Sequence, residues 1–415
     1  MDLTIQQNCP SCGAEIELNE ADRLIQCPYC EVNNFMVNRG LLRFVLPDKA
    51  PVHIDRREMF YAPYLRFKGN IYYCTGTHLK HRVIDTTQRG VNSSVLPLSL
   101  GLRPQAMRIS LVTDMVSGSF FRQTVKARTL LEKASQPTVH DSEKIKASLY
   151  SRAYIGESLS CIYLPLYIED GVLYDAVINK PLAHGGSAES LQKKSDRYHP
   201  GWTPHFLATL CPHCGDTLTG EHDSLVLSCC NCHSSWEEKQ GGFHPISWQR
   251  VVSHHDHMYY LPFWKLEVRS TGVEMNNFAD FLRITNQPLV VQPVHEQMVL
   301  SFWIPAFKLK PKTFIQLAKN MTVSQRKLPG GEQTMIKGMH PVTLQRTEAV
   351  QALKSVMAEA ALNKQQLLPL LPGMSFHPLA SDLTYLPFFD RGHDFVQEQS
   401  GLSLAKSVLR FGRSL

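Results

Sequence analysis

The chain has 415 residues, of which 43% are hydrophobic and 19% are charged, and its net charge is +6. This length is enough for two or three domains with buried cores, and the composition is that of a globular rather than a disordered protein. No apolar run reaches the roughly eighteen residues of a membrane-spanning helix. The N-terminus lacks the basic start and apolar stretch of a secretory signal peptide. We therefore expect no transmembrane segment and a cytoplasmic location.

The first motif is a pair of CxxC sequences near the N-terminus. Cys9-Pro-Ser-Cys12 is followed by fourteen residues and then by Cys27-Pro-Tyr-Cys30. Two such pairs supply four thiolates, the number that a tetrahedral structural zinc requires. Residues 14–18 and 23–27 alternate apolar and polar side chains, which predicts a β-hairpin that returns the second pair to the first. So small a unit cannot bury a core of its own, so we expect a metal to hold it together.

Residues 41–180 are predicted to form a β-rich module with helices between its hairpins. Residues 60–67 and 71–74 are rich in aromatic and apolar side chains and flank Lys68, Gly69 and Asn70, which predicts a hairpin with its turn there. A second hairpin is predicted to turn at residues 168–171 and to return over 172–177. Helices are predicted over 121–135 and over 142–153, where Asp141 is a candidate N-cap.

Part of this module is strongly basic. Residues 101–155 contain nine basic and four acidic side chains, a net charge of +5 (9 − 4). Such a segment could meet an anionic partner such as nucleic acid or a membrane surface, but a solvated helix face is the favoured explanation. The basic residues are Arg103, Arg108, Arg122, Lys126, Arg128, Lys133, Lys144, Lys146 and Arg152.

The four-cysteine pattern recurs after a predicted linker over residues 181–206, which is rich in Gly, Ser, Pro and Lys. Cys211-Pro-His-Cys214 is followed by fourteen residues and then by Cys229-Cys-Asn-Cys232. Only Cys229 has CxxC spacing with Cys232, so Cys230 is a spare, and His213 or His233 is an alternative ligand. The three cysteines outside the pairs are predicted to be small buried side chains: Cys74, Cys161 and Cys230.

A histidine cluster, His254-His255-Asp256-His257, follows the second motif. In an extended backbone His255 and His257 share one face, where they could ligate a metal or act as acid and base. An exposed polar approach to the next strand is the alternative. The sequence contains no phosphate-binding loop, dinucleotide fingerprint, HExxH motif or GxSxG elbow. No other catalytic chemistry is therefore indicated.

Five copies of an apolar-Pro-apolar-aromatic phrase suggest an internal repeat. They surround Pro63, Pro165, Pro262, Pro305 and Pro387. Cys9 and Cys211 are 202 residues apart (211 − 9), and this offset brings Pro63 close to Pro262. The spacing predicts two copies of one module in tandem.

The clearest predicted helix covers residues 344–362 in the second half of the chain. Val350, Leu353, Met357 and Ala360 recur at helical spacing, and Thr343 is a candidate N-cap. The predicted fold class is α+β and β-rich, with tandem duplication of a module made of a four-Cys zinc ribbon followed by β-hairpins with intervening helices. The predicted domains are ribbon 1 (1–40), β-rich module 1 with helices (41–180), the linker (181–206), ribbon 2 (207–240) and β-rich module 2 with helices (241–415).

Both cysteine motifs resemble the CPxCG knuckles of the zinc-ribbon superfamily, over residues 9–30 and 211–232. The glycine of that pattern is replaced after the second knuckle of each motif, by Glu31 and by His233. The resemblance implies two structural zinc ions, with iron the less expected metal. Four cysteines per ion leave no open coordination position, which argues against a catalytic metal. The expected ligands are Cys9, Cys12, Cys27 and Cys30 for the first ion, and Cys211, Cys214, Cys229 and Cys232 for the second.

Three functions follow as hypotheses. The first is a non-catalytic scaffold or adaptor that binds a protein partner, with aromatic strand edges as binding surface: Tyr61, Tyr64, Trp264, Trp303 and Phe389. The second is a nucleic-acid-binding protein that uses the basic 101–155 segment. Against it, residues 9–30 contain four acidic side chains and Arg23 as their one Lys or Arg. The third, a metalloenzyme built on residues 254–257, has the least support.

Overall fold

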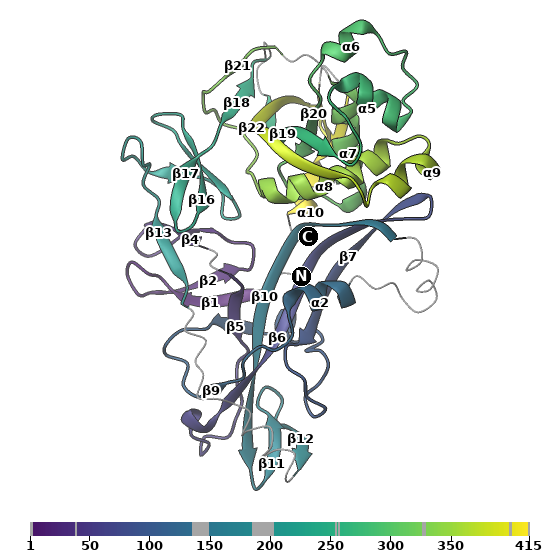
Figure 1. Cartoon of the computed structure of the whole chain (residues 1–415). Coiled ribbons are helices and arrows are strands. Elements are labelled where there is room, and N and C mark those ends of the chain that lie inside the picture. Colours follow the sequence, from purple (N-terminus) through teal and green to yellow (C-terminus); the bar gives the residue numbers. More distant parts are fainter. Residues whose placement is uncertain are drawn as a thin grey trace. The chain divides into compact units, whose positions relative to one another are not determined.

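The structure is a computed structural model that describes residues 3–37, 40–134, 149–184, 203–253, 255, 258–325, 329–397 and 401–413. The chain divides into two compact units. Unit 1 comprises Met1–Lys68, Ile84–Gln136 and Ser158–Thr209, and unit 2 comprises Gly69–Val83, Pro137–Glu157 and Leu210–Leu415. The fold is α+β and dominated by strands, as predicted (Figure 1).

The strands of the first half form two sheets. In the described residues, a ten-stranded sheet has the order β12-β11-β10-β5-β8-β1-β2, and β6 joins it through β10 and also pairs with β7 and β9. A three-stranded sheet has the order β13-β4-β3. The large sheet contains β1 (Thr4–Asn8), β2 (Glu15–Asn19), β5 (Leu42–Val45), β6 (Phe60–Thr75), β7 (His78–Arg89), β8 (Arg108–Leu111), β9 (Ser119–Phe120), β10 (Leu149–Glu169), β11 (Val172–Asp175) and β12 (Lys180–His184), and the small sheet contains β3 (Leu24–Gln26), β4 (Asn33–Val37) and β13 (His205–Ala208).

The turn predicted at Lys68, Gly69 and Asn70 is wrong. β6 continues through these residues, and nearly all of its side chains are buried. A strand covered on both faces gives an uninterrupted apolar pattern, which conceals its length. Gly69 instead allows β6 and β10 to approach each other closely, since a Cβ there would lie 2.9 Å from the Cα of Glu157 in β10. The chain turns later, at Gly76, whose φ is 58°.

The other local predictions for the first half have mixed outcomes. The second hairpin is confirmed, because β10 and β11 pair antiparallel around Asp170 and Gly171, which have positive φ. The helix predicted over 121–135 is shorter, α2 (Ala127–Ala134). The helix predicted over 142–153 lies outside the described residues up to 148, and from Leu149 onward it is wrong, because that part belongs to β10. The remaining helical turns are α1 (Arg103–Ala106) and η1 (Arg56–Glu58).

Where the structure describes the second half, its strands also form two sheets. A four-stranded sheet has the order β14-β15-β16-β17 in the described residues. The larger sheet has the order β20-β19-β22-β18-β21, and β23 joins β22 to β24. The strands are β14 (Leu218–Thr219), β15 (Val226–Cys229), β16 (Ser235–Lys239), β17 (Gly242–Pro245), β18 (Trp248–Val251), β19 (Tyr259–Thr271), β20 (Ser301–Pro305), β21 (Gly331–Glu332), β22 (Ser375–Asp390), β23 (Asp394–Val396) and β24 (Ser403–Ala405).

Helices α7 and α8 pack against the larger sheet of unit 2 (Figure 1). The helix predicted over 344–362 is α8, which covers Arg346–Ala360 and buries Leu353 and Met357. Its N-cap is Gln345 rather than Thr343, because the Glu348 carboxylate accepts the Gln345 N–H (3.1 Å) in a capping box. The helices of this half are α5 (Phe278–Thr285), α6 (Pro293–Gln297), α7 (Pro311–Ser324), α8, α9 (Lys364–Leu367), η2 (Leu368–Leu370) and α10 (Lys406–Gly412).

The strand pairing of the first half recurs in the second, as a tandem duplication predicts. After each cysteine motif a short strand pairs in parallel with a long one, β5 with β10 and β18 with β22. Each long strand also pairs with a second long strand, β10 with β6 and β22 with β19. Each is then followed by two short antiparallel strands, β11 and β12 or β23 and β24.

The aromatic side chains expected to form a binding surface are largely internal, so that expectation is wrong. Phe389 is partly exposed. The other four are at most 5% exposed, because β6, β19 and β20 bury side chains on both faces: Tyr61, Tyr64, Trp264 and Trp303.

The substitution Gly69→Ala should destabilise unit 2, because a methyl group cannot fit 2.9 Å from the Cα of Glu157 without moving a strand. Forced overpacking of this kind costs about 1–3 kcal/mol. The matched control is Gly242→Ala in β17, where an added Cβ would meet nothing within 4 Å. Thermal unfolding should show a lower Tm for the first variant and an unchanged Tm for the second. If the unmodified chain, Gly69→Ala and Gly242→Ala all had the same Tm, the close contact between β6 and β10 at Gly69 would be contradicted.

Candidate metal centres

The first four cysteines lie at the tips of two separate hairpins. Cys9 and Cys12 lie in the connection between β1 and β2, and Cys27 and Cys30 lie between β3 and β4. The hairpin predicted to join residues 14–18 to residues 23–27 is therefore wrong, since β2 and β3 belong to different sheets. The prediction missed β1 and β4, which are the antiparallel partners of β2 and β3.

The second four cysteines have a related setting in unit 2. Cys211 and Cys214 lie in a turn closed by the bridge between Leu210 and Thr217, and Cys229 and Cys232 lie where β15 turns into β16. Here β14 also pairs with β15. A hairpin thus connects the two pairs of cysteines directly, as the alternation predicted for the first motif.

All four knuckles share one backbone geometry. The residue after each second cysteine has a positive φ: 78° at Gly13, 59° at Glu31, 79° at Gly215 and 55° at His233. In three of them its N–H donates to the carbonyl of the first cysteine at 2.9 Å, namely from Gly13, Glu31 and Gly215. Each of these positions thus has a left-handed backbone conformation. Gly13 and Gly215 adopt it freely, whereas Glu31 and His233 adopt it at a cost in conformational free energy.

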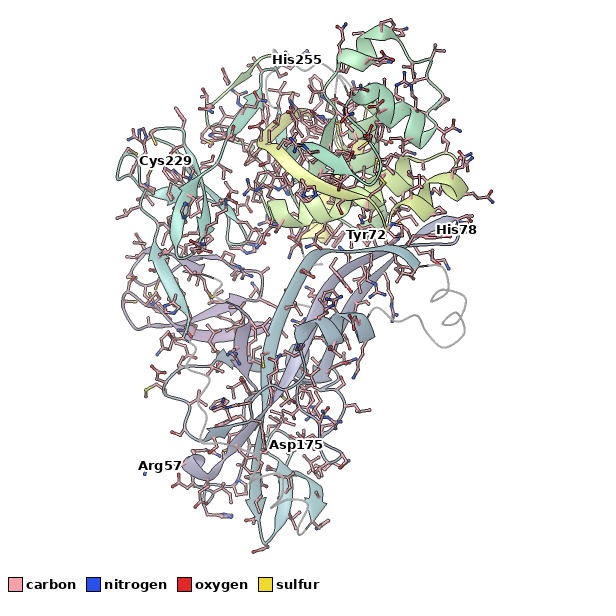
Figure 2. The ribbon with its side chains drawn as sticks, viewed as in Figure 1. Arg57, Tyr72, His78, Asp175, Cys229 and His255 are labelled. Carbon is pink, nitrogen blue, oxygen red and sulfur yellow. The ribbon has the colours of Figure 1, made fainter. Side chains whose placement is uncertain are left out.

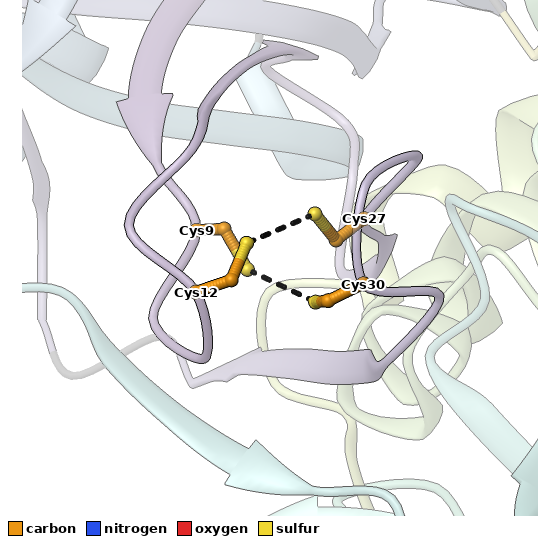
Figure 3. A group of neighbouring side chains, drawn as sticks. All are labelled: Cys9, Cys12, Cys27 and Cys30. Atoms are coloured by element: carbon orange, nitrogen blue, oxygen red, sulfur yellow. Dashed lines mark hydrogen bonds between the residues drawn. The ribbon is translucent and has the colours of Figure 1, made fainter.

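The sulfur atoms converge in both centres, as Figure 3 shows for the first. In each group the four Sγ atoms lie within 4.8 Å of one another. The Sγ atoms are 3.9 Å apart between Cys9 and Cys30 and 3.7 Å apart between Cys12 and Cys27. In the second centre the corresponding separations are 3.6 and 3.4 Å. These values are too long for disulfides and match the edge of about 3.8 Å of a tetrahedron with metal–sulfur bonds of about 2.3 Å.

The electrostatics of these sulfurs favour a cation. A hydrogen bond with Ser234 is the largest cause that lowers the pKa of Cys232 to about 5, and the His213 ring adds to it. Burial raises the pKa of Cys229 to about 12. Neighbouring thiolates repel, so one group ionises at the expense of the next. A metal ion at the centre would let all four ionise together, which is the state that ligates zinc.

The other cysteines and the alternative histidine ligands are not members of these groups. Cys74 and Cys161 are fully buried, as predicted, whereas Cys230 is exposed, so that prediction is wrong for it. The His233 ring accepts the N–H of Met335 (3.4 Å). Within the described residues, the metal-binding groups consist of cysteines alone. His213 thus contacts a ligand sulfur and is outside the group of four.

The structure adds little support for the other two candidate sites, the 254–257 histidine cluster and the basic 101–155 segment. In the 254–257 cluster, His254 and His257 lie outside the described residues, and the ring of His255 packs edge-on against Phe389 (4.7 Å; Figure 2 labels His255). In the basic 101–155 segment, Arg103 pairs with Asp175, Arg108 pairs with Glu17, and Arg128 pairs with Glu132. Lys144 and Lys146 lie outside the described residues.

The ribbon around the first centre is fastened to the body of its own unit by a buried ion pair. Glu20, between β2 and β3, contacts the guanidinium of Arg66 in β6, and both side chains are at most 4% exposed. Arg66 also donates two hydrogen bonds of 2.9 Å to Asp85 in β7. A buried charge is tolerated only with such partners. The position of the ribbon is therefore coupled to the two longest strands that precede β8.

The ribbon around the second centre is fastened in a comparable way. The indole N–H of Trp248 in β18 donates to the carbonyl of His233 (3.0 Å), and the Leu225 N–H donates to Val342 (2.8 Å). Arg413, after α10, donates to Asp223 in the ribbon loop (2.8 Å). The residue that follows α10 and the strand β18 are thus both bound to this ribbon.

Comparison with protein-family models, curated proteins and solved structures found no match. Among the described residues, no helix is long and apolar enough to cross a bilayer. The residues of the two sulfur groups are therefore the main guide to function.

Purified protein should contain two zinc ions per chain by elemental analysis, because each sulfur group matches one tetrahedral ion. The double substitution Cys9→Ser/Cys12→Ser should remove one ion, and Cys211→Ser/Cys214→Ser should remove the other. Cys230→Ser is the matched control and should retain both, since its exposed thiol lies outside the groups. Loss of zinc in the control, or full zinc content in either double variant, would refute the assignment.

The left-handed knuckle positions predict opposite effects of two substitutions in ribbon 1. Gly13→Ala places a Cβ at φ 78° and should weaken metal retention, whereas Glu31→Gly relieves the same conformation and should preserve or strengthen it. A left-handed residue costs roughly 1–2 kcal/mol, so metal affinity should change by about fivefold or more. Competition with a chromogenic chelator measures this. Equal affinities in both variants would show that these positions carry no such constraint.

Proposed function

We propose that this chain is a non-catalytic scaffold or adaptor protein whose two zinc ribbons brace two β-rich modules and which binds a protein partner. The observation that carries the proposal is the pair of closed four-sulfur groups. Four thiolates around one ion leave no position for water or substrate, so the metal would stabilise structure rather than catalyse a reaction.

The attachment of each ribbon to its own module supports the bracing role. In unit 1, Arg66 of β6 contacts Glu20 in the connection between the two cysteine-bearing hairpins. In unit 2, Trp248 of β18 contacts His233, the residue that follows Cys232. Binding energy at a structural zinc site contributes directly to folding, about 10–16 kcal/mol in small modules. Through these contacts it would stabilise more than the ribbons.

Exposed apolar side chains support a protein partner. The segment between α5 and β20 exposes four of them within eleven residues: Leu289, Val290, Val294 and Val299, at 51, 84, 49 and 61%. A concentration of this kind is typical of an interaction surface. It replaces the aromatic residues named from the sequence, which are largely buried. The location in the cytoplasm remains part of the same proposal.

The partner surface can be tested by affinity purification from the native host. Val290→Asp/Val294→Asp should lose a protein that co-purifies with the unmodified chain, because a charge in an apolar interface costs its desolvation. Val52→Asp, at a fully exposed site in unit 1, is the control and should keep it. Thermal unfolding should be unchanged in both variants, since the sites are exposed. If the set of co-purified proteins is the same for all three chains, this surface does not bind the partner.

A further inference from the structure

Two short sequences about one hundred residues apart form a cationic patch in unit 2. The first is Lys308-Leu-Lys-Pro-Lys312, which leads into α7, and the second is Arg410-Phe411, near the end of α10. In the first, Leu309 and Pro311 are buried while Lys310 and Lys312 are exposed. The alternation places both lysines on the solvent side of the segment.

The backbone of the lysine segment is held in place by hydrogen bonds. The Lys308 N–H donates to the hydroxyl of Thr343 (2.9 Å), and the carbonyl of Pro311 accepts from the hydroxyl of Tyr72 (2.9 Å). The Phe314 N–H donates to the Lys310 carbonyl and closes the first turn of α7 (2.9 Å). The exposed side chains of Lys310 and Lys312 thus extend from a backbone segment that hydrogen bonds hold in place.

Helix α10 brings the second sequence to this segment. Leu409 is buried, and Gly412 lies so close that a Cβ there would be 2.5 Å from the carbonyl oxygen of Lys308. The side chains of Arg410 and Phe411 remain outside, with Phe411 52% exposed. The ring centroid of Phe411 lies 6.0 Å from Lys310 Nζ and 5.5 Å from Arg410 Cζ. A half-exposed aromatic ring therefore lies within 6.0 Å of two cationic groups.

The charge of this patch is not neutralised locally. Within the part of the chain that the structure describes, Lys310, Lys312 and Arg410 form no ion pair, and the first turn of α7 carries no acidic residue. The neighbouring cations on the C-terminal segment differ, since Lys406 pairs with Asp390 and Arg413 pairs with Asp223. The three cations of the patch are available to an anionic ligand.

We propose that the cationic patch, defined as Lys310, Lys312, Arg410 and Phe411, binds single-stranded nucleic acid. The cations suit the phosphates of the strand, and the Phe411 ring offers an apolar face on which an unpaired base can stack. A duplex keeps its bases stacked internally and would use the cations alone. This activity goes beyond the scaffold function and does not depend on the sulfur groups.

Fluorescence anisotropy of the full chain with labelled oligo-dT and oligo-rU strands at several salt concentrations tests the proposal. Single-strand binding by three cations should give a slope of log affinity against log salt of about −2. Lys310→Gln/Arg410→Gln should reduce the slope to about −0.7 and weaken binding at low salt about tenfold or more. Phe411→Ala should weaken binding roughly tenfold with an unchanged slope, because it removes stacking and no charge.

The matched control is Lys126→Gln/Arg128→Gln, which removes two exposed cations from the basic 101–155 segment. It should leave affinity and slope unchanged, and all variants should keep their zinc content and Tm. The proposal is overturned if no strand binds at low salt, if the control variant loses binding instead, or if Phe411→Ala binds like the unmodified chain. Preference for a duplex, or binding only to vesicles of anionic lipid, would also overturn it.

Discussion

Mutual repulsion of thiolates is the constraint on which this structure depends. Each sulfur group places four cysteines within 4.8 Å of one another, at the tips of strands that are two to five residues long. Strands this short cannot offset the entropy of ordering the cysteine turns from their own buried surface. A bound cation would remove the repulsion and would supply the missing stabilisation at the same point.

The same arrangement appears twice, and in each unit it is joined to the main sheet by a few specific contacts. Arg66 links the first ribbon to β6 and β7, and Trp248 and Arg413 link the second to β18 and to the chain end. In the proposed function, an ion in each sulfur group would hold the cysteine-bearing turns in place. The contacts of Arg66, Trp248 and Arg413 would then extend that stabilisation to the rest of each unit.

The ligand set could be predicted from sequence because it depends on spacing alone, and the structure brings together the eight predicted cysteines. The hairpin of β10 and β11 could also be predicted, from its turn. The length of β6 could not, because a strand buried on both faces shows no break in its apolar pattern, and because Gly69, a residue typical of turns, lies against Glu157 instead. The aromatic strands were mistaken for surface for the same reason. The cationic patch depends on Gly412 packing against Lys308, a contact between distant sequences that no local pattern reveals.

X-ray absorption at the zinc edge of the purified chain tests the central claim most directly. The account predicts a first coordination shell of four sulfur atoms at about 2.3 Å, with no nitrogen or oxygen ligand. The same spectrum should be obtained when only one of the two centres is loaded. A shell that contains nitrogen or oxygen, or a protein that folds fully without any metal, would contradict the account.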